Sequence, residues 1–213
     1  MNLISTSFDN VYLIEEPVHT DDRGFFMETW NEIGYSNRKL LKDIPSLKAI
    51  QNDDSLFSTL FVQDNLSKSK LGVFRGLHYQ TGDFPQPKLV RVLKGSVIDF
   101  IVDLREDSKT YGKFEFFELN DKNNMSLFIP SYFAHGFLSL EDDTLLSYKC
   151  GSYYSKESEG SVNYNDPVIR HVINNKDTIK DVIEINLPHH NEKDLLISDK
   201  DKNAPKFLYR RHE

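Results

Sequence analysis

The chain has 213 residues, enough for one large domain with a substantial core. Its formal net charge of −7 and isoelectric point near 5.5 argue against nucleic acid as a partner, so an anionic ligand would need a local basic pocket. Cys150 is the only cysteine, which excludes an intramolecular disulfide, and no apolar run or signal-peptide pattern predicts a membrane segment, so we expect a cytoplasmic protein.

The first part of the chain mixes several element types. Residues 9–16 (DNVYLIEE) predict a strand, and the polar stretch 19–22 predicts a turn. A second strand is expected at 23–30, followed by a short helix over 31–43. Residues 44–58 lack a clean period and are interpreted as a surface insertion.

The middle of the chain predicts many short strands separated by turn residues. We expect strands at 60–65, 73–80, 88–93, 97–104, 111–119, 126–129, 136–140, 145–148 and 153–154. Beyond Pro167 we expect one strand at 168–173, helical turns near 178–185 and a charged tail at 206–213 that frays. Short strands at regular spacing predict an all-β sandwich or barrel.

The stretch 72–91 (GVFRGLHYQTGDFPQPKLVR) carries a histidine among cations. Residues three apart on a regular strand lie on opposite faces, so Arg75 and His78 would diverge unless Gly76 marks a bulge. With a bulge, His78 could act as a base beside cations, including Lys88 and Arg91, that stabilise an enolate. On these residues alone, a solvated basic face on an exposed hairpin is the simpler interpretation.

Three further residues are candidates only if the fold brings them to His78. His135, in IPSYFAHGF, could stabilise an oxyanion, ligate a metal or simply pack. Tyr148 could serve as a general acid, although most buried tyrosines are structural. Asp201 lies in a polar loop that is ordinarily solvated, and it would matter only by orienting the imidazole.

Metal and nucleotide-loop motifs are not found. The position two beyond His78 is Gln80, so a His-x-His pair is absent, and the adjacent His189 and His190 would face opposite ways in a strand. We therefore expect no metal site. No glycine-rich loop follows a strand to open a helix, which argues against Rossmann and P-loop sites.

Four longer stretches closely resemble the dTDP-4-dehydrorhamnose 3,5-epimerase family. They are FVQDNLSKSKLGVFRGLHYQ, PQPKLVRVLKGSVIDFIVDLREDSKTYGKF, IPSYFAHGFLSL and YYSKESEGSVNYNDP. The resemblance runs in the same order from about residue 17 to 205. It implies a cupin-type jelly roll or β-sandwich with short peripheral helices, a homodimer, and no metal or organic cofactor. The implied substrate is a nucleotide-linked 4-keto-6-deoxy sugar.

The resemblance also implies roles for individual residues. His78 matches the base that removes the protons at C3 and C5, and Asp201 matches the carboxylate that orients it. Tyr148 matches the acid on the opposite face, and Lys88 matches the cation beside the C4 oxygen. Tyr154 matches the ring that stacks on thymine. The sugar and diphosphate positions match Arg23, Glu28, Gln63, Asp64, Asn65, Arg75, His135, Glu159 and Lys200.

The function expected from this resemblance is epimerisation of dTDP-4-dehydro-6-deoxy-D-glucose at C3 and C5, in deoxysugar biosynthesis for a lipopolysaccharide or capsule. The domain would span residues 1–213. The alternatives are a single-site 3- or 5-epimerase, a 3,4-ketoisomerase, or a non-catalytic cupin that binds a sugar nucleotide. Because the family shares N-terminal segments across its dimer, Arg23 and Glu28 are expected to serve the neighbouring subunit's pocket.

Overall fold

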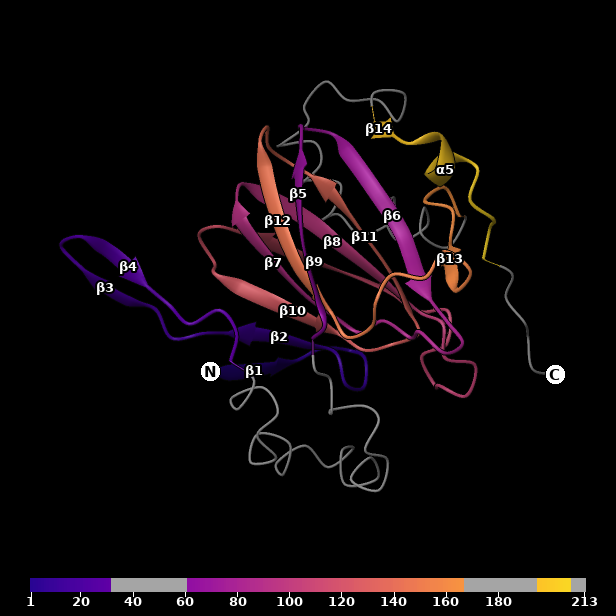
Figure 1. Ribbon diagram of the computed structural model, residues 1–213, viewed down its shortest axis with the longest axis horizontal. Coiled ribbons are helices and arrows are strands. Elements are labelled where there is room, and N and C mark those ends of the chain that lie inside the picture. Colours follow the sequence, from indigo (N-terminus) through magenta and orange to yellow (C-terminus); the bar gives the residue numbers. More distant parts are fainter. Residues whose placement is uncertain (32–60, 167–194, 208–213) are drawn as a thin grey trace.

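The computed structural model describes residues 1–31, 61–166 and 195–207. These residues form two large antiparallel sheets and a separate hairpin (Figure 1), which confirms the predicted all-β class. Several predicted elements lie outside the described residues. They are the expected helix at 31–43 from residue 32 on, the insertion at 44–58, the elements at 168–173 and 178–185, and the tail beyond 207.

The first sheet has the strand order β1-β2-β10-β7-β12-β5. Its strands are β1 (Asn2–Ser5), β2 (Tyr12–Glu15), β10 (Met125–Ile129), β7 (Lys88–Lys94), β12 (Thr144–Cys150) and β5 (Gln63–Ser69). The second sheet has the order β13-β6-β11-β8-β9, and the two-residue β14 pairs in parallel with β6. Its strands are β13 (Glu159–Ser161), β6 (Val73–Gln80), β11 (Phe133–Ser139), β8 (Ser96–Asp103), β9 (Phe114–Asn120) and β14 (Leu196–Ile197).

The main core lies between the two sheets. Side chains such as Val90 and Leu127 from the first sheet pack with Ile101, Leu119 and others from the second. Full burial of one such aliphatic side chain stabilises the fold by about 1.5–3 kcal/mol. The sandwich therefore holds both sheets firmly face to face, which fixes the side chains that point between them.

The outer face of the second sheet is covered as well, which explains a weak alternation in the sequence. All eight residues of β8 are buried, because Ile98, Phe100 and Val102 pack under a second apolar cluster on its outer side. The acidic Asp99 and Asp103 of the same strand point the other way and are fully buried. A strand covered on both faces reads as a nearly continuous apolar run rather than as an alternating one.

Most predicted strands are confirmed, with corrections at several ends. Strand β11 begins three residues before the predicted 136, and β5 runs from Gln63 to Ser69 instead of 60–65. Tyr153 and Tyr154 form no strand. Strands β1, β13 and β14 were not expected, and β13 and β14 carry too few residues for a period-two signal.

The stretch 19–22 was wrongly predicted as a turn. His19–Asp21 is strand β3, which pairs with β4 (Gly24–Phe26), so the turn is confined to Asp22 and Arg23. Only three residues of the predicted 23–30 strand are extended in a sheet. This hairpin projects away from the sandwich (Figure 1), and its exposed polar residues hid the strand signal.

The predicted bulge at Gly76 is present. His135 pairs with His78 and Phe137 with Arg75, so three steps on β6 oppose two on β11. Gly76 has φ +123°, and a Cβ there would lie 2.5 Å from the Gly136 Cα. Glycine is required at this position because the backbones of β6 and β11 touch in a conformation that other residues rarely adopt.

Candidate active site

A cavity of about 890 Å³ opens between the two sheets. Its walls come from β5, β7 and β12 of the first sheet, from β6, β11 and β13 of the second, and from residues 195–202. The bulge places both Arg75 and His78 in this lining. Its size suits a ligand of several rings, since small-molecule sites usually measure about 300–1,000 Å³.

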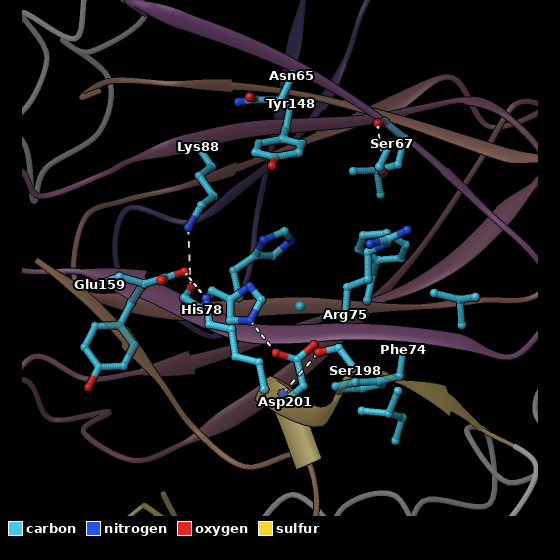
Figure 2. Close-up of a pocket in the computed structure, with 18 of the residues that line it drawn as sticks. Asn65, Ser67, Phe74, Arg75, His78, Lys88, Tyr148, Glu159, Ser198 and Asp201 are labelled. Atoms are coloured by element: carbon cyan, nitrogen blue, oxygen red, sulfur yellow. Dashed lines mark hydrogen bonds and ion pairs between the residues drawn. The ribbon is translucent and has the colours of Figure 1, made fainter. Parts of the chain in front are cut away.

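His78 forms a hydrogen bond with the carboxylate of Asp201, which lies below it in Figure 2. Its Nε2 lies 2.6 Å from Oδ1 of Asp201, which is on the four-residue helix α5 (Asp199–Lys202). Burial alone would raise the pKa of Asp201, but the hydrogen bond and charge of His78, with a donor from the Gly76 N–H, lower it below its usual value. An ionised Asp201 holds the proton on Nε2, which leaves Nδ1 able to accept another.

Lys88 supplies a buried cation beside this pair. Its side chain lies on β7, is 6% exposed, and its Nζ donates to the His78 carbonyl oxygen at 3.4 Å (Figure 2). Burial lowers the pKa of Lys88, against the opposing influence of Cys150, Asp99 and Glu159. An ammonium held in a poorly solvated site interacts strongly with any negative charge that develops next to it.

A second histidine–carboxylate pair lies deeper. His135, the register partner of His78 on β11, has its Nε2 2.8 Å from Oδ2 of Asp99. Asp99 is fully buried, and its Oδ1 has no hydrogen-bond partner among the described residues. Burial raises the pKa of this carboxyl group, and the nearby His135 and Lys88 oppose that change. Asp99 therefore fixes the ring of His135 at the cavity wall.

Tyr148 approaches from the other sheet, on β12, and faces the cavity across from His78 (Figure 2). Burial raises its pKa, so the hydroxyl keeps its proton at neutral pH. Cys150, two residues on, also lines the cavity, and burial raises the pKa of its thiol to about 11. Cys150 is therefore a neutral wall group, whereas Tyr148 can act as a proton donor.

The cavity rim carries a linked acid, base and ring. Lys200 of α5 forms an ion pair with Glu159 of β13 at 2.6 Å, and the Tyr154 hydroxyl donates to the same carboxylate at 3.2 Å. Gln63 accepts from the Tyr154 backbone N–H at 3.0 Å and donates to Asn65 at 2.9 Å. The rim thus presents an aromatic face and charged groups suited to a base and a phosphate-bearing ligand.

The fold brings most of the expected site residues into one place. The cavity lining includes His78, Tyr148, Asp201, Lys88, Gln63, Asn65, Arg75, His135, Tyr154, Glu159 and Lys200. Arg91 does not join them: it is three residues after Lys88, faces the other side of β7, and contacts Met27 and Asn124. Lys88 and Arg91 therefore belong to different environments despite their proximity in the sequence.

Three other expected residues also lie outside this cavity. Asp64 points to the outer face of β5 and pairs with Lys149 at 2.7 Å, so its assignment to the binding set stays a prediction without support from this cavity. Arg23 lies at the turn of the β3–β4 hairpin and pairs with Asp21, and Glu28 lines a smaller cavity of about 310 Å³ near His19. Neither Arg23 nor Glu28 is among the residues of this subunit that line the cavity around His78.

Sequence reasoning missed the residues that support the site. Asp99 was not singled out, although an acidic residue inside the apolar run VIDFIVD is a usable signal for a buried partner. Ser198, whose side chain accepts from the Asp201 N–H at 3.1 Å, gave no local signal because α5 is so short. In the described ranges, no group of three or more His, Cys, Asp or Glu side chains is placed to hold a metal ion.

The fold and the cavity define a class of protein: a cupin-type β-sandwich whose cavity holds a histidine–carboxylate pair, a lysine and a tyrosine. Residues 5–208 match the family described as dTDP-4-dehydrorhamnose 3,5-epimerase, and the chain belongs to that family. A relative of that description from Methanothermobacter thermautotrophicus is 41% identical over 200 residues, which cover 94% of this chain and 91% of the relative.

Solved structures agree with this assignment. The dTDP-4-dehydrorhamnose 3,5-epimerase of Elizabethkingia anophelis superposes with a TM-score of 0.75 at 40% identity, over 97% of this chain and 96% of that one. A dTDP-6-deoxy-D-glucose-3,5-epimerase from Legionella pneumophila, solved in complex with dTDP-4-keto-L-rhamnose, gives 0.73 at 33% identity, over 98% and 99%. Both the fold and the chain length are therefore shared with these enzymes.

Proposed function

We propose that the protein epimerises dTDP-4-dehydro-6-deoxy-D-glucose at C3 and C5 to give dTDP-4-dehydro-L-rhamnose. The observation that carries the proposal is the placement of two proton-transfer groups on opposite walls. His78, bound to Asp201, belongs to the second sheet, and Tyr148 belongs to the first. Inversion of a carbon centre needs a proton removed from one face and returned to the other, and this cavity holds a group for each.

The chemistry follows from the C4 ketone. A hydrogen on C3 or C5 is acidic because the electron pair left behind delocalises onto the C4 oxygen as an enolate. His78 Nδ1 takes the proton, the Lys88 ammonium stabilises the enolate oxygen, and the Tyr148 hydroxyl returns a proton to the opposite face of the same carbon. His78 then loses its proton to solvent and Tyr148 regains one, so the same groups can act on the second carbon.

The proposed substrate orientation uses the remaining lining residues. Arg75 and His135 would hold the sugar, while Lys200, Glu159 and Tyr154 at the rim would hold the diphosphate and thymine. The support for a dTDP-sugar is the Legionella pneumophila enzyme solved with such a ligand. We place the reaction in the cytoplasm, in keeping with the buried, unpaired Cys150.

We also propose that the protein acts as a homodimer that completes each site with its hairpin. Phe25 and Phe26 are 62% and 71% exposed, and the Arg23 side chain at the tip is 90% exposed. A two-stranded hairpin is at best marginally stable alone in water, so this one needs a surface to cover it. A second copy would cover the phenylalanines and bring Arg23 to the partner's cavity.

The experiment is proton NMR of the purified protein with dTDP-4-dehydro-6-deoxy-D-glucose in D₂O. We expect deuterium at both C3 and C5, and His78→Ala should slow both exchanges on the order of 10²–10⁴-fold with the fold intact. Exchange at one carbon alone would indicate a single-site epimerase or a 3,4-ketoisomerase. Tight binding of dTDP with no exchange would indicate a binding module and overturn the proposal.

A further inference from the structure

Asn163, a buried asparagine outside the cavity, connects helix α5 to the second sheet. Asn163 is 9% exposed, and its Nδ2 donates to the carbonyl oxygens of Lys202 and Ala204, both at 2.9 Å. Its backbone N–H donates to the Pro205 carbonyl at 2.8 Å. Asn163 therefore binds the end of α5 and the residues that leave it, by three hydrogen bonds.

The other side of this tie is the strand that carries His78. Val162, next to Asn163, exchanges two backbone hydrogen bonds with Leu77, at 2.9 and 3.2 Å. Ser161 is the register partner of His78 itself. Asn163 is therefore held next to the part of β6 that carries His78, and its hydrogen bonds to the end of α5 set the distance between that helix and the imidazole.

Helix α5 needs such support because it is only four residues long. A helix of this length does not hold its shape alone, since each turn of nucleation fixes more dihedral angles than it gains hydrogen bonds. Ser198 caps its first turn through the Asp201 N–H at 3.1 Å, and the preceding β14 pairs with β6. Asn163 holds the opposite end, so Asp201 is fixed from both sides.

The hydrogen bonds of the Asn163 side chain require an amide group. Both hydrogens of the Asn163 Nδ2 are used on carbonyl oxygens, and its Oδ1 accepts from the Asn165 N–H at 2.8 Å. Aspartate would set a carboxylate against two carbonyl oxygens, and alanine would leave both carbonyls without this donor. Buried acceptors that lose their donor are costly, so α5 would move to find others.

We propose that Asn163 is a positioning residue: it holds α5 so that the Asp201 carboxylate stays 2.6 Å from His78 Nε2. The inference rests on the proposed function only in taking His78 as the base. A displacement of about 1 Å in a catalytic group can cost on the order of 10²-fold in rate. Asn163 would therefore affect the turnover number although it does not touch the ligand.

The test compares Asn163→Asp, Asn163→Ala and Asn163→Ser with a matched control. Asn123→Ala removes an asparagine that likewise donates to a backbone carbonyl and accepts from backbone N–H groups, but in the distant β9–β10 turn. The first measurement, without substrate, is the downfield imidazole N–H proton resonance of the His78–Asp201 bond, identified by its absence in Asp201→Asn. The second is kcat and KM for exchange in D₂O.

We expect the Asp and Ala variants to lose or broaden the resonance and to lower kcat about 10- to 100-fold. KM should rise as well, because Lys200 lies on the same helix. Serine keeps one donor, so Asn163→Ser should fall between alanine and the native protein and guards against a variant that fails to fold. Asn123→Ala should lower the melting temperature but leave the resonance and kcat unchanged. A native resonance and kcat in folded Asn163→Ala would overturn the inference.

The two proposals fail in different ways. If the Asn163 variants lose the resonance while even the native protein exchanges no deuterium, the proposed function is wrong and the positioning role stands. If the native protein exchanges deuterium and folded Asn163 variants do so equally well, the positioning role is wrong and the proposed function stands.

Discussion

Substitution of Tyr148 can test proton exchange and inversion separately. We expect Tyr148→Phe to keep deuterium exchange from the His78 face but to slow formation of the inverted product on the order of 10²–10⁴-fold, since the ring remains and only the donor is lost. Coupling the reaction to a product-specific reductase would measure inversion apart from exchange. Tyr153→Phe is the control, because Tyr153 is 63% exposed and outside the cavity. Undiminished inversion in Tyr148→Phe would place the donor elsewhere.

Asp103 is a buried carboxylate whose ionised form the fold favours. It accepts five hydrogen bonds, from Arg105 (side chain at two nitrogens, and backbone N–H), Ser108 and Thr110. Burial alone would raise its pKa, but these donors lower it below the usual 3.8. Because the folded pKa is the lower one, its stabilisation is present above the unfolded value and is lost as the pH falls through the folded value.

We therefore expect Asp103→Asn to lower the free energy of unfolding at neutral pH by about 2–4 kcal/mol. The difference from the native protein should begin to shrink below about pH 4, where the carboxyl group of the unfolded chain becomes protonated, and should shrink further as the pH falls through the lower pKa of the folded protein. Urea unfolding at both pH values measures this. Asp107→Asn, an exposed aspartate on the same loop, should change neither value. An equal deficit at both pH values would contradict the assignment.

At the scale of an element, the β6 bulge decides which residues share the cavity. Gly76→Ala should destabilise the fold by about 2–4 kcal/mol and abolish exchange, because its Cβ would lie 2.5 Å from the Gly136 Cα and 2.8 Å from the His135 carbonyl oxygen. Gly82→Ala is the control: it also has positive φ, at +65°, but open space around it, so about 1 kcal/mol is expected. Thermal unfolding and D₂O exchange measure both. A Gly76→Ala protein as stable and active as Gly82→Ala would refute the account.

At the scale of the whole molecule, the proposed role of the hairpin predicts that two inactive variants recover activity when they are mixed. Arg23→Ala and His78→Ala should each be nearly inactive alone. If the hairpin serves the partner's site, a mixed dimer has one site with both residues intact, and an equal mixture should recover about a quarter of native activity. If each hairpin serves its own subunit, or the protein is a monomer, mixing recovers nothing. Light scattering of each variant supplies the oligomeric state.

The sequence predicted much of the fold and the residue types of the site, for reasons that are local. Strands such as 73–80 and 88–93 appear in the pattern because one face or both are apolar. Gly76 predicted a bulge because glycine within a strand has few other uses. By contrast, α5 and β14 are too short for a periodic signal, and their positions depend on contacts with β6 from more than a hundred residues away.

The sequence by itself determined the all-β class, the family, and the presence of a histidine, a lysine and a tyrosine suited to proton transfer. The tertiary structure decided which of them meet. It placed Asp201 on His78, Asp99 on His135 and Asp64 on the outer surface. Three aspartates are chemically alike in the sequence; only burial and non-local contacts distinguish a carboxylate that is bound to a histidine from one that faces water.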